Sequence, residues 1–181
     1  MSALGSWRSQ GGRVRSFLFG LVMVGVVGCG TAAKVKRLST VEKDHYQALR
    51  VWMDGTQEKA YLKKKTQAER DTYLKESGLW DRFYKYSPEE RTAILEGDVQ
   101  VGFKIDQVFM AWGEPHDRTR LPGRQAERSE LLVYRFEVDQ EELIRVWSPD
   151  SKTAYKAVDQ FRRELIIDDA KVAEIKEKKG W

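Results

Sequence analysis

The sequence predicts an α+β fold, with a helical N-terminal segment followed by a short helix packed on a small antiparallel β-sheet. Between residues 39 and 97, helix-capping patterns alternate with glycines at the spacing of short helices. From residue 98 onward, apolar residues tend to alternate at every second position, as they do in strands. The chain has 181 residues, which suits one ordinary domain with a helical extension.

The first 28 residues have the form of a secretory signal peptide. Three arginines, Arg8, Arg13 and Arg15, precede an apolar and glycine-containing stretch over 17–28, and no acidic residue occurs before Glu42. This stretch is shorter than the roughly 20 residues of a helix that crosses a bilayer. Its length and flanking charges instead fit the apolar region of a cleaved signal.

Val26-Val27-Gly28-Cys29 ends this stretch and resembles the lipobox of bacterial lipoproteins. The resemblance implies that Cys29 is diacylated on sulfur, becomes the new N-terminus by cleavage, and is then acylated on its amine. Two or three acyl chains would hold the protein on a membrane essentially permanently. The alternative is an incidental cysteine inside a membrane anchor. Gly30 stands where an aspartate marks inner-membrane retention in many Gram-negative bacteria, so we expect sorting to the outer membrane.

Residues 29–38 are small, polar and basic without apolar periodicity, which predicts a flexible tether between lipid and fold. Cleavage would remove three arginines and no acid, leaving 29 basic residues in place of 32, against 28 acidic ones. This near-neutral balance gives no reason to expect a nucleic-acid partner. The basic run at 63–65 has acidic residues close to it and fits a solvated helix face.

The helical region spans 39–97, and its first predicted helix covers 40–54. Ser39 and Glu42 form a capping box at its start, and Gly55 is expected as its C-terminal cap. His45 lies on or beside the apolar stripe of this helix. A packed core histidine is therefore favoured over a ligand at this position.

Residues 57–77 are predicted to form either one bent helix or two. Thr56 can cap the helix that begins here, and a second capping box at Thr66 can start another. A last helix begins at Ser87, which is followed by a proline at the first helical position, and Gly97 ends it.

Four aromatic residues fall within seven positions at 80–86. Such a cluster buries a large apolar area and packs with specific ring geometry. We expect Trp80, Phe83 and one tyrosine to pin the helices to the second half of the chain. The alternative is an aromatic docking surface for a partner, with Trp80 and Tyr84 as its contact residues.

A different pattern begins at residue 98. A short strand is predicted over 99–103, and an amphipathic helix over 104–112 that a glycine cap and a proline end. Residues 113–129 are rich in Pro, Gly and Arg and predict a mobile loop.

The remaining residues predict an antiparallel sheet. Over 131–138 the alternation makes one core face, formed by Leu132, Tyr134, Phe136 and Val138. Further apolar runs predict short strands at 143–147, 154–161 and 164–167. Residues 169–179 have a helix-forming composition, yet a turn and a strand over 171–176 are preferred, with 177–181 as a tail.

Residues 98–176 carry a series of short motifs. These are Gln107-Val108 within the predicted helix, Gly113-Glu114-Pro115 at its end, an aromatic strand that contains Tyr134-Arg135-Phe136, and the closing segment 165–172. Together with the lipobox they resemble the BamE (also SmpA or OmlA) group of small outer-membrane lipoproteins. The resemblance implies that family's α+β fold, and as partners the outer-membrane protein insertion machinery, with peptidoglycan or anionic lipid as further candidates.

The chain departs from that family at several positions. Phe103 replaces the usual methionine, Lys104 replaces a Ser or Thr cap, and the helices before residue 98 are absent from the short family members. A second, weaker likeness links 66–74 and 80–82 to the so-called GWxTD domain of bacterial exported proteins, although its Gly-Trp-x-Thr-Asp signature is absent.

Motifs for catalysis are missing from the sequence. It has no Gly-x-Ser-x-Gly nucleophile motif and no glycine-rich phosphate cradle, and its single cysteine is expected to be acylated. His116 and Asp117 beside Glu114 could be drawn as a proton relay, but they fall in a predicted surface turn. We expect no catalytic residue, no cofactor, no metal site and no small-molecule substrate.

These patterns favour a lipid-anchored periplasmic binding or scaffold lipoprotein of the outer membrane. It would contact membrane lipid through Cys29 and an envelope protein through residues predicted at Phe103, Trp112, Glu114, His116, Trp80 and Tyr84. The alternatives are a lipoprotein of another envelope complex, in transport, motility or surface scaffolding, and a wall-active enzyme.

Overall fold

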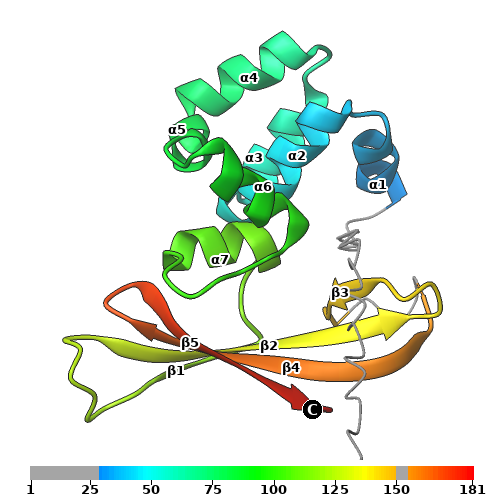
Figure 1. The fold of residues 1–181 in the computed structure, drawn as a ribbon. Helices are drawn as coiled ribbons and strands as arrows, with labels where there is room; N and C mark the ends of the chain where they lie inside the picture. Colours follow the sequence, from blue (N-terminus) through cyan, green and yellow to red (C-terminus); the bar gives the residue numbers. More distant parts are fainter. Residues whose placement is uncertain (1–28, 150–154) are drawn as a thin grey trace, which may run out of the picture.

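The computed structural model describes residues 29–149 and 155–181, and it has the α+β fold that the sequence predicts (Figure 1). Helices α1 to α6 form an upper layer, α7 lies below them, and α7 in turn covers one face of an antiparallel sheet. The helices are α1 (Cys29–Lys36), α2 (Thr40–Leu49), α3 (Gly55–Lys63), α4 (Gln67–Glu76), α5 (Leu79–Tyr84), α6 (Pro88–Glu96) and α7 (Ile105–Trp112), with a 3-10 turn η1 (Arg50–Trp52) after α2. The strands are β1 (Asp117–Arg120), β2 (Ser129–Asp139), β3 (Ile144–Val146), β4 (Ala157–Asp168) and β5 (Lys171–Lys179).

Side-chain caps determine where most of the helices begin. Capping boxes start α2 at Ser39, α4 at Thr66 and α6 at Ser87, as the sequence predicts. The stretch 57–77 is therefore divided between two helices. The predicted C-terminal cap at Gly55 is wrong, because the Asp54 carboxylate accepts two backbone N–H groups and makes Gly55 the first residue of α3.

The predicted tether is helical in the structure. Residues 29–36 form α1, which contacts α3. Leu38, just after α1, is buried, with 5% of its surface exposed. Val35 packs against the same core. Two alanines favour the helical backbone, and these two apolar side chains dock it, so the prediction of a flexible segment over 29–38 was wrong.

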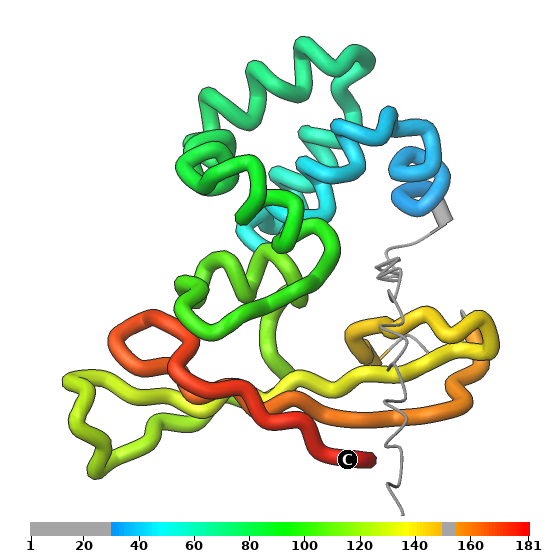
Figure 2. The backbone as a smooth tube through the Cα atoms, viewed as in Figure 1, coloured from blue at the N-terminus to red at the C-terminus, as the bar shows by residue number. Residues whose placement is uncertain are grey.

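The sheet has the order β1-β2-β4-β5, and all pairs are antiparallel. Strand β3 pairs with β2 as well, at the opposite end of the edge that β1 occupies. The predicted strands at 154–161 and 164–167 are one continuous strand, β4. The preferred strand over 171–176 is confirmed as β5, which continues to Lys179 and so includes part of the predicted tail 177–181. The tube view shows the β1–β2 connection and the β4–β5 turn at the same end of the sheet (Figure 2).

Two local predictions before β2 were wrong. Residues 99–103 form a turn at Gly102, with φ of +94°, and only Lys104 makes an isolated bridge, to Lys171. The predicted loop over 113–129 contains β1, whose four residues are all exposed. An exposed edge strand has no apolar alternation to reveal it, so the sequence pattern could not distinguish it from a loop.

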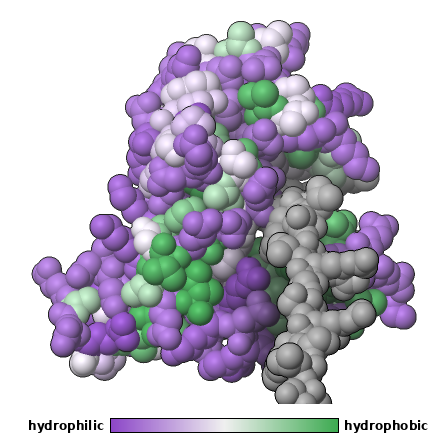
Figure 3. Space-filling model, viewed as in Figure 1, coloured by the Kyte–Doolittle hydropathy of each residue, from purple (hydrophilic) through white to green (hydrophobic). Residues whose placement is uncertain are grey.

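One hydrophobic core runs from the helical layer through α7 to the sheet. Leu132, Tyr134 and Phe136 are buried on the helix-facing side of β2, as predicted, whereas Val138, predicted for the same face, is only half-buried near the end of the strand. The Trp112 ring meets both aromatic rings edge to face, with centroids 5.1 Å apart in each case. Hydrophilic residues cover most of the surface seen in Figure 3, and hydrophobic residues gather on it where the helices meet the sheet.

Candidate functional site

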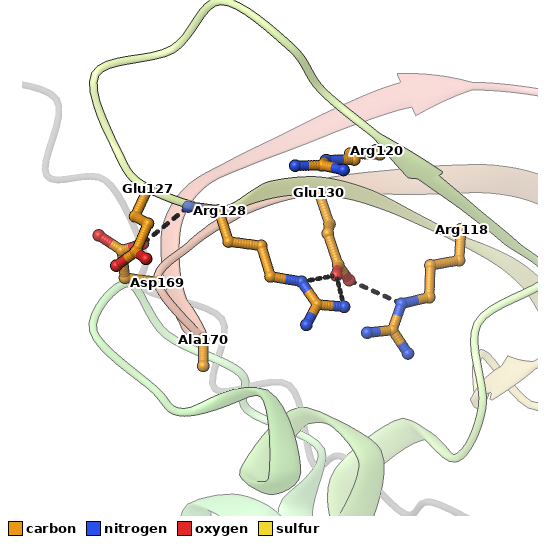
Figure 4. A pocket seen from close by; sticks show the side chains of 7 residues that line it. All are labelled: Arg118, Arg120, Glu127, Arg128, Glu130, Asp169 and Ala170. Atoms are coloured by element: carbon orange, nitrogen blue, oxygen red, sulfur yellow. Dashed lines mark hydrogen bonds and ion pairs between the residues drawn. The ribbon is translucent and has the colours of Figure 1, made fainter.

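A pocket of about 800 Å³ lies at the end of the sheet where the β1–β2 connection, the β4–β5 turn and the beginning of α7 approach one another (Figure 4). Three arginines dominate its lining, so we call it the arginine pocket. Its lining residues are Arg118, Arg120, Glu127, Arg128, Glu130, Asp169 and Ala170.

The arginine pocket is organised by Glu130, a carboxylate that is only 6% exposed. Arg118 donates from Nε to Glu130 Oε2 at 2.6 Å, and Arg128 donates from Nε and Nη2 to Glu130 Oε1 at 2.7 and 2.6 Å. Strand register produces this arrangement: Arg118 pairs with Leu132, and Glu130 lies two residues before Leu132 on the same face of β2.

The three arginines and three carboxylates that line the arginine pocket are unevenly distributed, because all three guanidinium groups lie around Glu130. The hydrogen bond from Arg118, together with that from Arg128, holds the pKa of Glu130 below its ordinary value against the opposing effect of burial. Arg120 lies directly opposite Glu130 in the register, but Glu130 is already bound by the other two arginines. Among the residues that the structure describes, Arg120 has no hydrogen-bond or ion-pair partner. Three guanidinium groups therefore surround one carboxylate.

An apolar recess adjoins the arginine pocket. It has a volume of about 140 Å³, shares four lining residues with the larger pocket, and adds Ile105 and Ile167. Its wall is held in place by the α7 start, since the N–H of Ile105 donates to the carbonyl of Ala170 at 2.9 Å. Asp169 and Ala170 form the β4–β5 turn with φ of 47° and 63°, values that non-glycine residues seldom adopt.

The sequence did not predict this pocket. Arg118, Arg120 and Arg128 were expected in a mobile loop, because their proximity depends on the pairing of β1 with β2 rather than on a linear motif. The one available signal is the alternation of Arg118 and Arg120, which puts both side chains on the same face of a strand.

The predicted contact residues do not come together in one site. Trp112 is 2% exposed and its Nε1–H donates to the carbonyl of Gly97 at 2.8 Å, so it is a core residue rather than a contact surface. Phe103 is half-buried and packs against the same core. Glu114 and His116 are exposed, and the His116 ring lies 5.2 Å from that of Trp147, edge to face.

Trp80 and Tyr84 are half-buried and stack on each other, with centroids 4.1 Å apart. They enclose His45, which is 2% exposed and shares a 2.7 Å hydrogen bond between Nε2 and the Tyr84 hydroxyl. Asp71 lies 3.6 Å from His45 Nδ1. Burial lowers the pKa of His45, opposed by the charge of Asp71, so the imidazole is neutral at pH 7. The expected packed histidine is confirmed, and it lies inside the helical layer.

The signal peptide predicted over 1–28 lies outside the described residues, as does the side chain of Cys29. Within the described ranges, no helix is both long and apolar enough to cross a membrane. In the same part of the chain, no three His, Cys, Asp or Glu side chains gather in a way that could bind a metal ion. No protein-family model, curated protein or solved structure matches the chain.

Proposed function

We propose that the chain is a lipid-anchored binding lipoprotein of the outer membrane that faces the periplasm. The observation that carries this proposal is the position of Cys29. This residue ends the lipobox-like motif and is also the first residue of α1. Cleavage before it would leave an N-terminus that continues directly into a folded element, and acyl chains on it would hold the body at the membrane surface.

The arginine pocket supports a role in binding. Guanidinium groups stay protonated at every physiological pH, so they bind and orient anions and do not exchange protons with a substrate. Arg118 and Arg128 are held by a buried carboxylate, and Arg120 is available beside them. Such a preorganised group of donors suits recognition of an anionic group on a partner.

The proposed partner is an envelope protein, and outer-membrane protein assembly is the process we propose first. The helix α7 followed by β2, β4 and β5 fits the order of elements in the resembled family, although no strand precedes α7 within the described residues. A role in another envelope complex is the alternative.

Mass spectrometry of the native N-terminus tests the anchor. We expect a chain that begins at Cys29 with added acyl mass and sediments with membranes, whereas a Cys29→Ser variant is not acylated. Gly30→Ala is the matched control: no atom lies within 4 Å of its added Cβ, so this variant should be acylated normally. A native chain that begins elsewhere, or a Cys29 without acyl mass, would contradict the proposal.

Pull-down from detergent-solubilised membranes tests the partner. Co-isolation of outer-membrane insertion proteins supports the assembly role. Their absence together with enrichment of a different envelope complex supports the alternative.

A further inference from the structure

We propose that the arginine pocket binds the carboxyl terminus of a partner polypeptide that ends in an apolar residue. This inference gives the chemistry of the partner for the binding role proposed above, and it rests on that role only in requiring a protein partner. It does not depend on the lipid anchor.

The free donors of the arginine pocket match a single carboxylate. Glu130 accepts from Arg118 Nε and from Arg128 Nε and Nη2, which leaves further N–H groups on both guanidiniums. Arg120 adds a complete fork of donors, and two parallel N–H groups fit the two oxygens of a carboxylate. The cluster of three arginines around the buried Glu130 carries two net positive charges. Glu127 and Asp169 balance them over the whole lining, so the positive charge is concentrated at the guanidinium cluster, where a monoanion would bind.

The acidic rim argues against a polyanion. Glu127 and Asp169 line the opposite side of the pocket from Arg118, where the Asp169 carboxylate accepts the backbone N–H of Arg128 (Figure 4). A ligand with many charges in a row, such as a nucleic acid, would bring some of them close to these two carboxylates. A ligand with one compact charge would not.

The apolar recess provides the second point of recognition. It lies against the arginine pocket, between Ile105, Ile167 and Ala170. Its volume of about 140 Å³ corresponds to roughly five water molecules in the liquid. That space admits one aliphatic side chain but not a long acyl chain, so a last residue such as leucine fits better than a lipid tail.

The edge of the sheet provides the third point of recognition. β1 is an edge strand of the described sheet, so alternate backbone N–H and C=O groups on its outer side have no strand partner. An extended peptide can add to this edge by main-chain hydrogen bonds. Because Arg118 and Arg120 belong to β1, a peptide along this strand would bring its last residue to the pocket that they line.

The test is fluorescence anisotropy with the purified full-length chain in detergent. The probe is a labelled hexapeptide, Gly-Ser-Gly-Ser-Val-Leu with a free carboxyl terminus, and its twin is the same peptide with a C-terminal amide. We expect saturable binding of the free acid and binding weaker by about tenfold or more for the amide, which loses the charge-assisted hydrogen bonds. Arg120→Gln should weaken the free acid by about the same factor, because it removes one fork of charged donors.

Arg124→Gln is the matched control for charge. Arg124 lies in the same connection but pairs with Asp168 and does not line the pocket. This variant should therefore bind the free acid nearly as the wild type does. Dihexanoyl phosphatidylglycerol is added as a competitor, to test whether a lipid headgroup is the preferred ligand.

Several results would overturn the inference. These are equal binding of acid and amide, equal weakening by Arg120→Gln and Arg124→Gln, tighter binding of the short-chain lipid than of the peptide, and no binding of the free acid. Since none of these readouts involves acylation, they leave the anchoring proposal unaffected, and loss of acylation at Cys29 would not change them.

Discussion

Replacing Trp112 by phenylalanine tests whether this residue joins the helices to the sheet. Its indole is 2% exposed, lies edge to face with Tyr134 and Phe136, and donates to the carbonyl of Gly97. Phenylalanine keeps an aromatic ring in the core but cannot donate this hydrogen bond. We expect Trp112→Phe to lower the free energy of unfolding substantially without a change of fold.

The magnitude follows from two losses. The missing hydrogen bond leaves the buried Gly97 carbonyl unpaired, which costs about 1–3 kcal/mol. The smaller ring leaves a space of about 40 Å³, which at about 24 cal/mol per Å³ adds about 1 kcal/mol. The expected loss of stability is therefore about 2–4 kcal/mol, a large part of the stability of an ordinary domain.

Urea unfolding followed by circular dichroism measures this loss. Trp80→Phe is the matched control, because Trp80 is half-buried, stacks on Tyr84 and has no hydrogen bond from its indole nitrogen to another described residue. We expect this control to lose less than about 1 kcal/mol. Equal losses in the two variants, or no loss in Trp112→Phe, would refute the placement of Trp112 in the joint.

Three further predictions follow from local geometry. Burial lowers the pKa of His45 below the ordinary 6.5, so its contribution to stability is present above pH 6.5 and is lost as the pH falls towards the folded-state pKa. Urea unfolding at about pH 7.5 and about pH 5.5 should therefore show a larger decrease in the free energy of unfolding for the wild type than for His45→Gln. Ala170→Gly removes the strain of a non-glycine residue at a φ of 63° and should raise the free energy of unfolding by about 0.5–1 kcal/mol, after the cost of a more flexible unfolded chain. Ala173→Gly, in strand β5, should lower it, and thermal unfolding compares the two variants. Ser87→Ala removes the hydroxyl that accepts the Glu90 N–H at the start of α6 and should cost about 1 kcal/mol in urea unfolding, and an unchanged midpoint would count against the cap.

The helical half was predictable wherever a cap is written in the sequence. Ser39, Thr66 and Ser87 each satisfy a backbone group within three residues, so the signal is local and the predicted helix starts are confirmed. The end of α2 was not predictable in this way. Thr56 was expected to cap the next helix and Gly55 to end the one before it. Both predictions were wrong, because Asp54 caps α3, and Gly55 and Thr56 lie in its first turn.

In the sheet, prediction was limited by the distance in sequence between the paired strands. The core face of β2 follows from its own alternation, but β1 has no apolar residue and is a strand only because β2 offers it an edge. The arginine pocket could not be predicted for the same reason. Glu130 and Arg118 are twelve residues apart, and only the register of two strands brings them into contact.

The first helix carries a mechanical consequence if Cys29 bears the lipid. An eight-residue helix spans only about 12 Å, and α1 begins at that same residue and docks on α3 without an intervening linker. The folded body would then have no flexible linker to the lipid, so its own shape would set its height and tilt over the bilayer. A partner would have to bind it within a narrow zone above the lipid headgroups.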